Sequence, residues 1–262
     1  MPRDEDMVVQ LRPQGGVRDL AHAGRMALDH IRASGPPTEP SAVVVAAFHA
    51  VYVAEADAER RAILDAARGD AARCDRLLLG ALPALARHLG QGWVDGTTSF
   101  VDVSIACAHI HDALRRLGDV AEPDPGAACV VVATPEAEDH TLPLALLRYR
   151  LRRAGLHVRS LPDAQARGVA RAIDDTGAAM VMLSASTDRG LLRAADILRA
   201  LRRAGRRVPV ALGGAAVLRS LDIARAAGAD CITDDPMAAL RACGVAANDA
   251  APVGTGSDGG GR

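Results

Sequence analysis

The spacing of apolar residues changes near residue 120, and this change constrains the fold of the 262-residue chain more than any other feature. Before it, apolar residues recur every three to four positions, as they do along one face of an α-helix. After it, short runs rich in β-branched residues alternate with amphipathic stretches. The sequence therefore predicts a helical first half followed by an α/β second half.

The first half is predicted to form four helices, over residues 17–33, 41–68, 71–89 and 99–117. Glycine and proline, which disfavour helix, mark their ends: Gly35-Pro36-Pro37 follows the first, and Gly90 and Gly92 close the third. Because the connections are short, we expect an antiparallel four-helix bundle over residues 17–119. Residues 1–16 are expected to form a flexible extension.

The second half begins after a turn-rich linker over residues 120–126. Helices are expected between five candidate strands, which cover residues 129–133, 157–161, 180–184, 208–212 and 230–233. Such β–α–β alternation predicts a doubly wound, five-stranded parallel sheet of the flavodoxin-like (Rossmann-like) α/β class over residues 127–245. Residues 246–262, rich in glycine and small polar residues, are expected to be a disordered tail.

Composition narrows the classes of function. With 31 basic and 32 acidic residues the formal net charge is -1, so no global field favours a nucleic acid. Fewer than 20 residues precede the first helix, which leaves no room for a helix-turn-helix module. The five cysteines show no CxxC spacing, and no apolar run approaches membrane-spanning length. We therefore expect a cytoplasmic protein with no direct DNA-binding module and no contact with a membrane.

The residues that follow strands 1, 3 and 4 are the candidate site, because parallel sheets bind ligands beyond the carboxyl ends of their strands. In a flavodoxin-like sheet these three strands are adjacent. The candidate residues are Glu138, Asp139, His140, Ser184, Ser186, Gly213 and Gly214.

Residue chemistry suggests a role for each group. The imidazole of His140 is a candidate metal ligand, and Glu138, two residues earlier, is expected to accept the other ring N–H. The glycine pair, lacking β-carbons, is expected to leave room for a bulky group beside strand 4.

These residues resemble the cobalamin-binding domain of corrinoid enzymes and photoreceptors, which carries Asp-x-His-x-x-Gly, Ser-x-Leu and Gly-Gly at similar spacings. Here Glu138-Asp-His140-Thr-Leu-Pro143 is followed by 40 residues, Ser184-Ala-Ser186, 26 residues and Gly213-Gly214. This chain departs from the family pattern at Glu138, Pro143 and Ser186.

The resemblance implies cobalamin as the cofactor, as adenosylcobalamin or hydroxocobalamin. It assigns His140 as the lower cobalt ligand in place of the cofactor's own dimethylbenzimidazole. It further implies that Ser184 contacts the displaced base and that the Gly213-Gly214 pair makes room for it. Haem is the alternative cofactor, because its iron also accepts one imidazole.

The helical half carries a second resemblance, in residues 90–104. This segment is similar to the helical cap over the upper corrin face, where a tryptophan often sits above the macrocycle. Trp93 is the sole tryptophan of the chain, and the alternative is that it packs inside the bundle. Photoreceptors of the CarH/LitR type place an upper-ligand histidine directly after this tryptophan, whereas Val94 stands here.

The segment instead resembles the AerR/PpaA regulators of bacterial photosynthesis genes. That resemblance implies a non-enzymatic transcriptional regulator, an antirepressor acting through a CrtJ/PpsR-type repressor. It also implies a photoreceptor or redox sensor in which light or oxygen acts through ligation at His140. A corrinoid methyl carrier for methyltransferases, a haem-binding sensor and a domain that has lost its ligand remain the alternatives.

Overall fold

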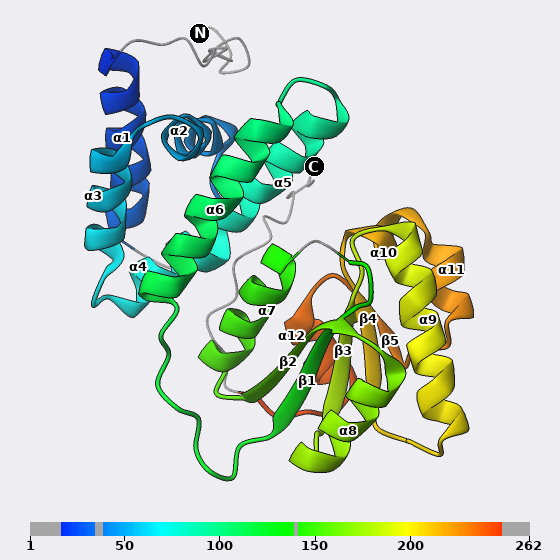
Figure 1. Cartoon of the computed structure of the whole chain (residues 1–262). Helices are drawn as coiled ribbons and strands as arrows, with labels where there is room; N and C mark the ends of the chain where they lie inside the picture. Colours follow the sequence, from blue (N-terminus) through cyan, green and yellow to red (C-terminus); the bar gives the residue numbers. More distant parts are fainter. Residues whose placement is uncertain (1–16, 35–38, 139–140, 248–262) are drawn as a thin grey trace, which may run out of the picture. The chain divides into compact units, whose positions relative to one another are not determined.

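The computed structural model describes residues 17–34, 39–138 and 141–247, which divide into two units (Figure 1). The first unit ends at Asp119 and is helical; the second begins at Val120 and contains the sheet. The predicted extension, residues 1–16, and residues 248–262 of the predicted tail lie outside the described residues.

The helical unit is built around one apolar helix. This helix, α2, packs against α1, α5 and α6, and its Phe48, Val51 and Tyr52 are buried. The elements of the unit are α1 (Val17–Arg32), α2 (Ala42–Val53), α3 (Asp57–Ala67), α4 (Ala71–Asp75), a π-helical turn η2 (Arg76–Ala81), α5 (Leu82–Val94) and α6 (Phe100–Leu117).

The predicted helix over residues 41–68 is wrong, because the chain breaks there into α2 and α3. The buried guanidinium of Arg60 explains the break. Its Nη1 donates to the carbonyls of Val51 (2.6 Å) and Ala54 (2.7 Å), which close the carboxyl end of α2. These are carbonyls that a helix end leaves without intrahelical partners, so a side chain from α3 stabilises the end of α2.

The predicted end of the third helix near residue 89 is also wrong. Helix α5 continues to Val94, with Gly90 and Gly92 inside it. The turn after α5 folds back onto Gly92, whose carbonyl accepts from the amides of Thr97 (2.8 Å) and Thr98 (3.0 Å). A β-carbon at residue 92 would collide with Thr98 Oγ1, so glycine serves close packing here rather than ending the helix.

The second unit is a five-stranded parallel sheet in the order β2-β1-β3-β4-β5 (Figure 1), which confirms the predicted flavodoxin-like α/β class. Its strands are β1 (Cys129–Pro135), β2 (His157–Ala164), β3 (Met180–Ser184), β4 (Val210–Gly213) and β5 (Cys231–Ile232). Its helices are α7 (Thr141–Arg153), α8 (Ala166–Thr176), α9 (Asp188–Arg203), α10 (Ala215–Arg219), α11 (Leu221–Ala226) and α12 (Pro236–Ala242).

Alternate residues of the central strands pack into two separate hydrophobic cores, one on each face of the sheet. Val130 and Val132 of β1 pack on the face covered by α7 and α12. Val131 and Ala133 pack on the opposite face, under α8, α9, α10 and α11. Because both faces are covered, the loops beyond the strand ends are the open positions of the sheet. Between β4 and β5 the chain forms two helices, α10 and α11, divided at Ser220, and α12, which follows the last strand, was not predicted.

Candidate functional site

The carboxyl ends of β1, β3 and β4 lie side by side, as the sheet order requires. Ser184, the last residue of β3, is paired in register with Gly213, the last residue of β4. The Ala185 amide donates to the Gly213 carbonyl at 2.9 Å. The structure therefore brings together the serine and glycine positions predicted from sequence. Asp139 and His140, the predicted ligand segment, lie outside the described residues.

Glu138 joins the loop after β1 to the loop after β3. Its side chain is buried, with the residue 6 % exposed, and Oε2 accepts from the Ser186 amide at 2.8 Å. The same oxygen accepts from the Thr187 amide (3.3 Å) and hydroxyl (3.4 Å). Thr187 is the N-cap of α9, so this carboxylate lies where the helix dipole favours negative charge. The contact expected between Glu138 and His140 stays a prediction, whereas the contacts that the structure describes hold the start of α9.

Two residues with a left-handed backbone support the same loop. Ala137 (φ 64°) and Asp163 (φ 51°) are the non-glycine residues of the described chain with positive φ. The Ala137 amide donates to Asp163 Oδ1 at 3.0 Å, which ties the loop after β1 to the end of β2. Strained residues of this kind cluster at binding sites. Asp163 was not among the residues selected from the sequence, because the strand predicted over residues 157–161 ends before it, whereas β2 extends to Ala164.

The glycine pair has a packing role that the sequence analysis did not foresee. A β-carbon at Gly213 would lie 2.7 Å from the carbonyl oxygen of Thr233. At Gly214 (φ 98°) it would collide with the backbone of Ala185. The chain's own backbone therefore requires glycine at both positions, whether or not the pair also leaves room for a ligand. A role for these glycines in cofactor binding stays a prediction.

Ser186 links the site to α10 and α11. Its amide donates to Glu138, and its carbonyl accepts from Arg219 Nη2 at 2.7 Å. Beside it, Ser220 Oγ donates to Asp188 Oδ1 at 2.9 Å. The loop after β3 is thus bonded on one side to the β1 loop and on the other to the junction of α10 and α11. Arg219 was not selected from the sequence, since one arginine among many gives no signal.

Trp93 belongs to the helical unit, at the last turn of α5. The residue is 51 % exposed, which contradicts the alternative that it packs inside the bundle. Its ring meets that of Phe100, with centroids 6.3 Å apart. The exposed large apolar residues of this segment are Trp93, Val94, Phe100, Val101 and Ile105. They form an apolar surface on the helical unit, the kind of surface that marks a binding site.

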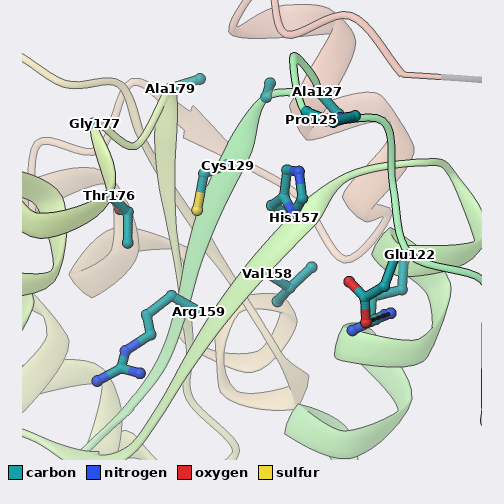
Figure 2. A pocket seen from close by; sticks show the side chains of 12 residues that line it. Glu122, Pro125, Ala127, Cys129, His157, Val158, Arg159, Thr176, Gly177 and Ala179 are labelled. Atoms are coloured by element: carbon teal, nitrogen blue, oxygen red, sulfur yellow. Dashed lines mark hydrogen bonds and ion pairs between the residues drawn. The ribbon is translucent and has the colours of Figure 1, made fainter.

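A hollow of about 550 Å³ lies at the other end of the sheet, against the amino ends of β1, β2 and β3 (Figure 2). Its polar groups already hold the linker that precedes β1. Arg152 donates to Glu122 (3.0 Å) and to the Val120 carbonyl (3.0 Å), and His157 Nε2 donates to the Asp124 carbonyl at 3.0 Å. These side chains anchor the entry to the sheet, so the candidate site stays at the carboxyl ends.

Within the described residues, no three His, Cys, Asp or Glu side chains are grouped to hold a metal ion. No helix in those same ranges is long and apolar enough to cross a membrane.

Comparisons with known proteins find matches to the α/β unit and to much of the chain. Residues 128–241 match the family described as B12 binding domain. The chain is 26 % identical over 159 residues to an uncharacterized 20.5 kDa protein in the bchF-crtJ intergenic region of Rhodobacter capsulatus. That match covers 59 % of this chain and 83 % of the relative.

Two solved structures are similar. The Methanosarcina barkeri monomethylamine corrinoid protein matches with a TM-score of 0.53 at 19 % identity, over 71 % of this chain and 93 % of that one, and supports the fold. A cobalamin-binding protein from Desulfitobacterium hafniense DCB-2 matches at 19 % identity with a TM-score of 0.43, over 76 % of this chain and 97 % of that one.

Proposed function

Since residues 128–241 match the B12-binding domain family, we propose that the chain is a cobalamin-binding regulator of transcription that acts through a protein partner. The match to this family is the observation that supports cobalamin as the cofactor. The relative from the bchF-crtJ intergenic region supports a role connected with photosynthesis genes, because its gene lies in a photosynthesis gene cluster. The partner proposed is a repressor of the CrtJ/PpsR type, the chain acting as its antirepressor and not as an enzyme.

The residues at the strand ends fit a corrinoid. Ser184 and Gly213 are register partners at the ends of β3 and β4, so the serine and glycine positions of the proposed site lie together at the carboxyl end of the sheet. His140 is the proposed cobalt ligand, and Trp93 on its apolar surface is the proposed contact for the corrin face. Cobalamin, when bound, would supply a cobalt centre whose ligation responds to light or to oxidation state.

The contacts of Glu138 suggest how a change at residue 140 would reach the surface. A shift of the β1 loop acts through Glu138 on the amides of Ser186 and Thr187. From Ser186 it reaches Arg219. A change of ligation would therefore bias the position of α9 and of the α10–α11 junction, a shift between two arrangements.

The test of the cofactor is an absorption spectrum. Purified protein and its His140→Ala variant are incubated separately with hydroxocobalamin, adenosylcobalamin or haem, desalted, and compared in the dark and after illumination. The proposal expects retained cobalamin with a band shift that depends on His140. A Soret band alone would transfer the assignment to a haem sensor, and retention of neither would indicate a ligand-free domain.

The test of the partner is a gel-shift assay with a CrtJ/PpsR-type repressor and its operator. The cobalamin-loaded protein is expected to release the repressor from DNA, with different efficiency in light and dark, and His140→Ala is expected to lose that difference. Release of the repressor in neither condition would contradict the antirepressor role.

A corrinoid methyl carrier is the second candidate, favoured by the fold likeness to the monomethylamine corrinoid protein. A carrier would support methyl transfer to a thiol acceptor when mixed with a corrinoid-dependent methyltransferase. Measured transfer above the level of free cobalamin would favour the carrier over the regulator.

A further inference from the structure

Two histidines meet in the helical unit, and the proposed function uses neither. His49 lies on α2 and His88 on α5, two helices that pack against each other. Their Nδ1 and Nε2 atoms are 3.2 Å apart, with ring centroids separated by 5.1 Å and planes inclined by 66°. Two ring nitrogens from different helices therefore lie within hydrogen-bonding distance of each other.

The separation of these nitrogens suits a metal ion. Two imidazole nitrogens on one tetrahedral Zn²⁺, at about 2.0–2.1 Å each, lie about 3.3 Å apart. The 3.2 Å between His49 Nδ1 and His88 Nε2 is close to this nitrogen–nitrogen distance. Between two imidazoles a hydrogen bond uses one lone pair and one N–H, whereas a metal ion uses the lone pairs of both neutral rings.

The surroundings of His49 keep its ring neutral and place one carboxylate, that of Asp102, near it. Burial, and then the charge of His88, lower the pKa of His49, so its ring is neutral near pH 7 as a ligand must be. The Asp102 carboxylate acts in the opposite direction on His49 and attracts positive charge. The neighbouring cation, Arg87, is paired with Glu39 at 2.8 Å, which offsets its repulsion.

The site is also open to solvent. His88 is exposed and His49 is half-buried, so an ion can enter from water and keep water molecules as its remaining ligands. Because α2 is held between α1, α5 and α6, the backbone that carries His49 is fixed before an ion arrives. Such preorganisation lowers the cost of binding.

We propose that His49 and His88 form a two-histidine binding site for an imidazole-preferring divalent transition-metal ion, Zn²⁺ or Cu²⁺. Imidazole suits these two ions, and Cu²⁺ stands highest in the affinity order of the divalent series. The site uses none of the residues proposed to hold cobalamin, and both histidines lie outside the residues that match the B12-binding domain.

The test is calorimetric titration of Zn²⁺ into chelator-treated, cofactor-free full-length protein carrying His140→Ala, which removes the other proposed ligand. His49→Gln and His88→Gln are compared with His22→Gln, an exposed histidine of α1 that serves as the matched control. Loss of an outer-shell partner alone costs roughly 10- to 100-fold in metal affinity, so loss of a ligand is expected to cost at least as much. Equal Zn²⁺ affinity in all variants would overturn the site.

A second measurement keeps the test valid if a variant folds poorly. The Cu²⁺ electron paramagnetic resonance spectrum of the His140→Ala protein at one equivalent is expected to show coupling to two imidazole nitrogens. His88→Gln is expected to reduce that coupling, and His22→Gln to leave it unchanged. A Cu²⁺ spectrum without coupling to two imidazoles, in protein whose helical content is intact, would refute the proposal.

Discussion

Removing the negative charge of Glu138 is expected to loosen the start of α9. In Glu138→Gln an amide oxygen can still accept from Ser186 and Thr187, but the charge that strengthens those bonds is lost. Hydrogen bonds to charged groups contribute about 1.5–3 kcal/mol, against about 0.5–1.5 for neutral pairs. An acidic group at a helix amino end adds roughly 0.3–1 kcal/mol. We therefore expect Glu138→Gln to lower the free energy of opening this region by about 1–2 kcal/mol.

Glu138→Ala is expected to cost more. It leaves the Ser186 and Thr187 amides, now 2.8 and 3.3 Å from the carboxylate, without their acceptor. An unsatisfied buried donor costs about 1–3 kcal/mol, and water entering the vacated space offsets part of it. The expected loss in the free energy of unfolding is about 3 kcal/mol.

Hydrogen exchange of the two amides measures the loss where it occurs. A cost of 1–2 kcal/mol corresponds to roughly 5- to 30-fold faster exchange if these amides exchange by local opening. Glu136→Gln is the matched control, since that side chain is exposed in the same loop and should change stability by less than about 0.5 kcal/mol. The reasoning fails if the Ser186 and Thr187 amides exchange at the same rate in Glu138→Gln and Glu136→Gln.

Three further outcomes are expected. Gly214→Ala forces an alanine to φ 98° against the Ala185 backbone, and should cost about 2–4 kcal/mol in thermal denaturation; an unchanged melting temperature would contradict the packing role. Trp93→Ala should cost under about 1 kcal/mol, because the ring is half-exposed, yet weaken cobalamin binding measured by equilibrium dialysis. Burial, and then the charge of Arg76, lower the pKa of His30. Its free energy contribution to folding should therefore be lost as the pH falls below about 6.5, the pKa of an unperturbed histidine. Urea unfolding of His30→Gln should accordingly show a flatter dependence of stability on pH.

The sheet could be predicted because its signals are local and repeated. The strand predicted over residues 180–184 coincides with β3, Met180–Ser184, where every residue is buried. A run buried on both faces shows as continuous apolar sequence, bounded by turns, and helices between such runs demand a parallel arrangement. The strand order then places the ends of β1, β3 and β4 together without any tertiary information.

The helical unit was harder to predict because its breaks depend on tertiary contacts. Nothing local to residues 41–68 ends a helix at Val53, since the carbonyls there are satisfied by Arg60 from the following helix. Gly92 was read as a helix end on propensity, a preference of only about 1 kcal/mol that packing against Thr98 overrides. Arginine is usually a surface residue, so its burial at a helix end leaves no pattern in the sequence.

The candidate site shows the same division. Sequence spacing selected Glu138, Ser184 and Gly213, and the structure brings their strands together. Spacing could not predict which groups the Glu138 carboxylate would contact, nor that Asp163 would hold the Ala137 amide. Side-chain direction in a loop depends on several backbone angles at once, so small differences in those angles redirect a carboxylate by several ångströms.

The length of the Glu138 side chain determines which amides its carboxylate can reach. Its Oε2 reaches the Ser186 amide, and a β-carbon at Gly190 would lie 2.6 Å from that oxygen, so a long acid at 138 and a glycine at 190 are matched. Aspartate is shorter by one carbon–carbon bond, about 1.5 Å. Glu138→Asp should therefore free the Ser186 and Thr187 amides and speed their exchange, while keeping a carboxylate two residues before His140 in the sequence. If Glu138 serves the imidazole alone, Glu138→Asp should preserve both the cobalamin spectrum and the exchange rates; if it also joins the two loops, the spectrum should survive and the protection of Ser186 and Thr187 should not.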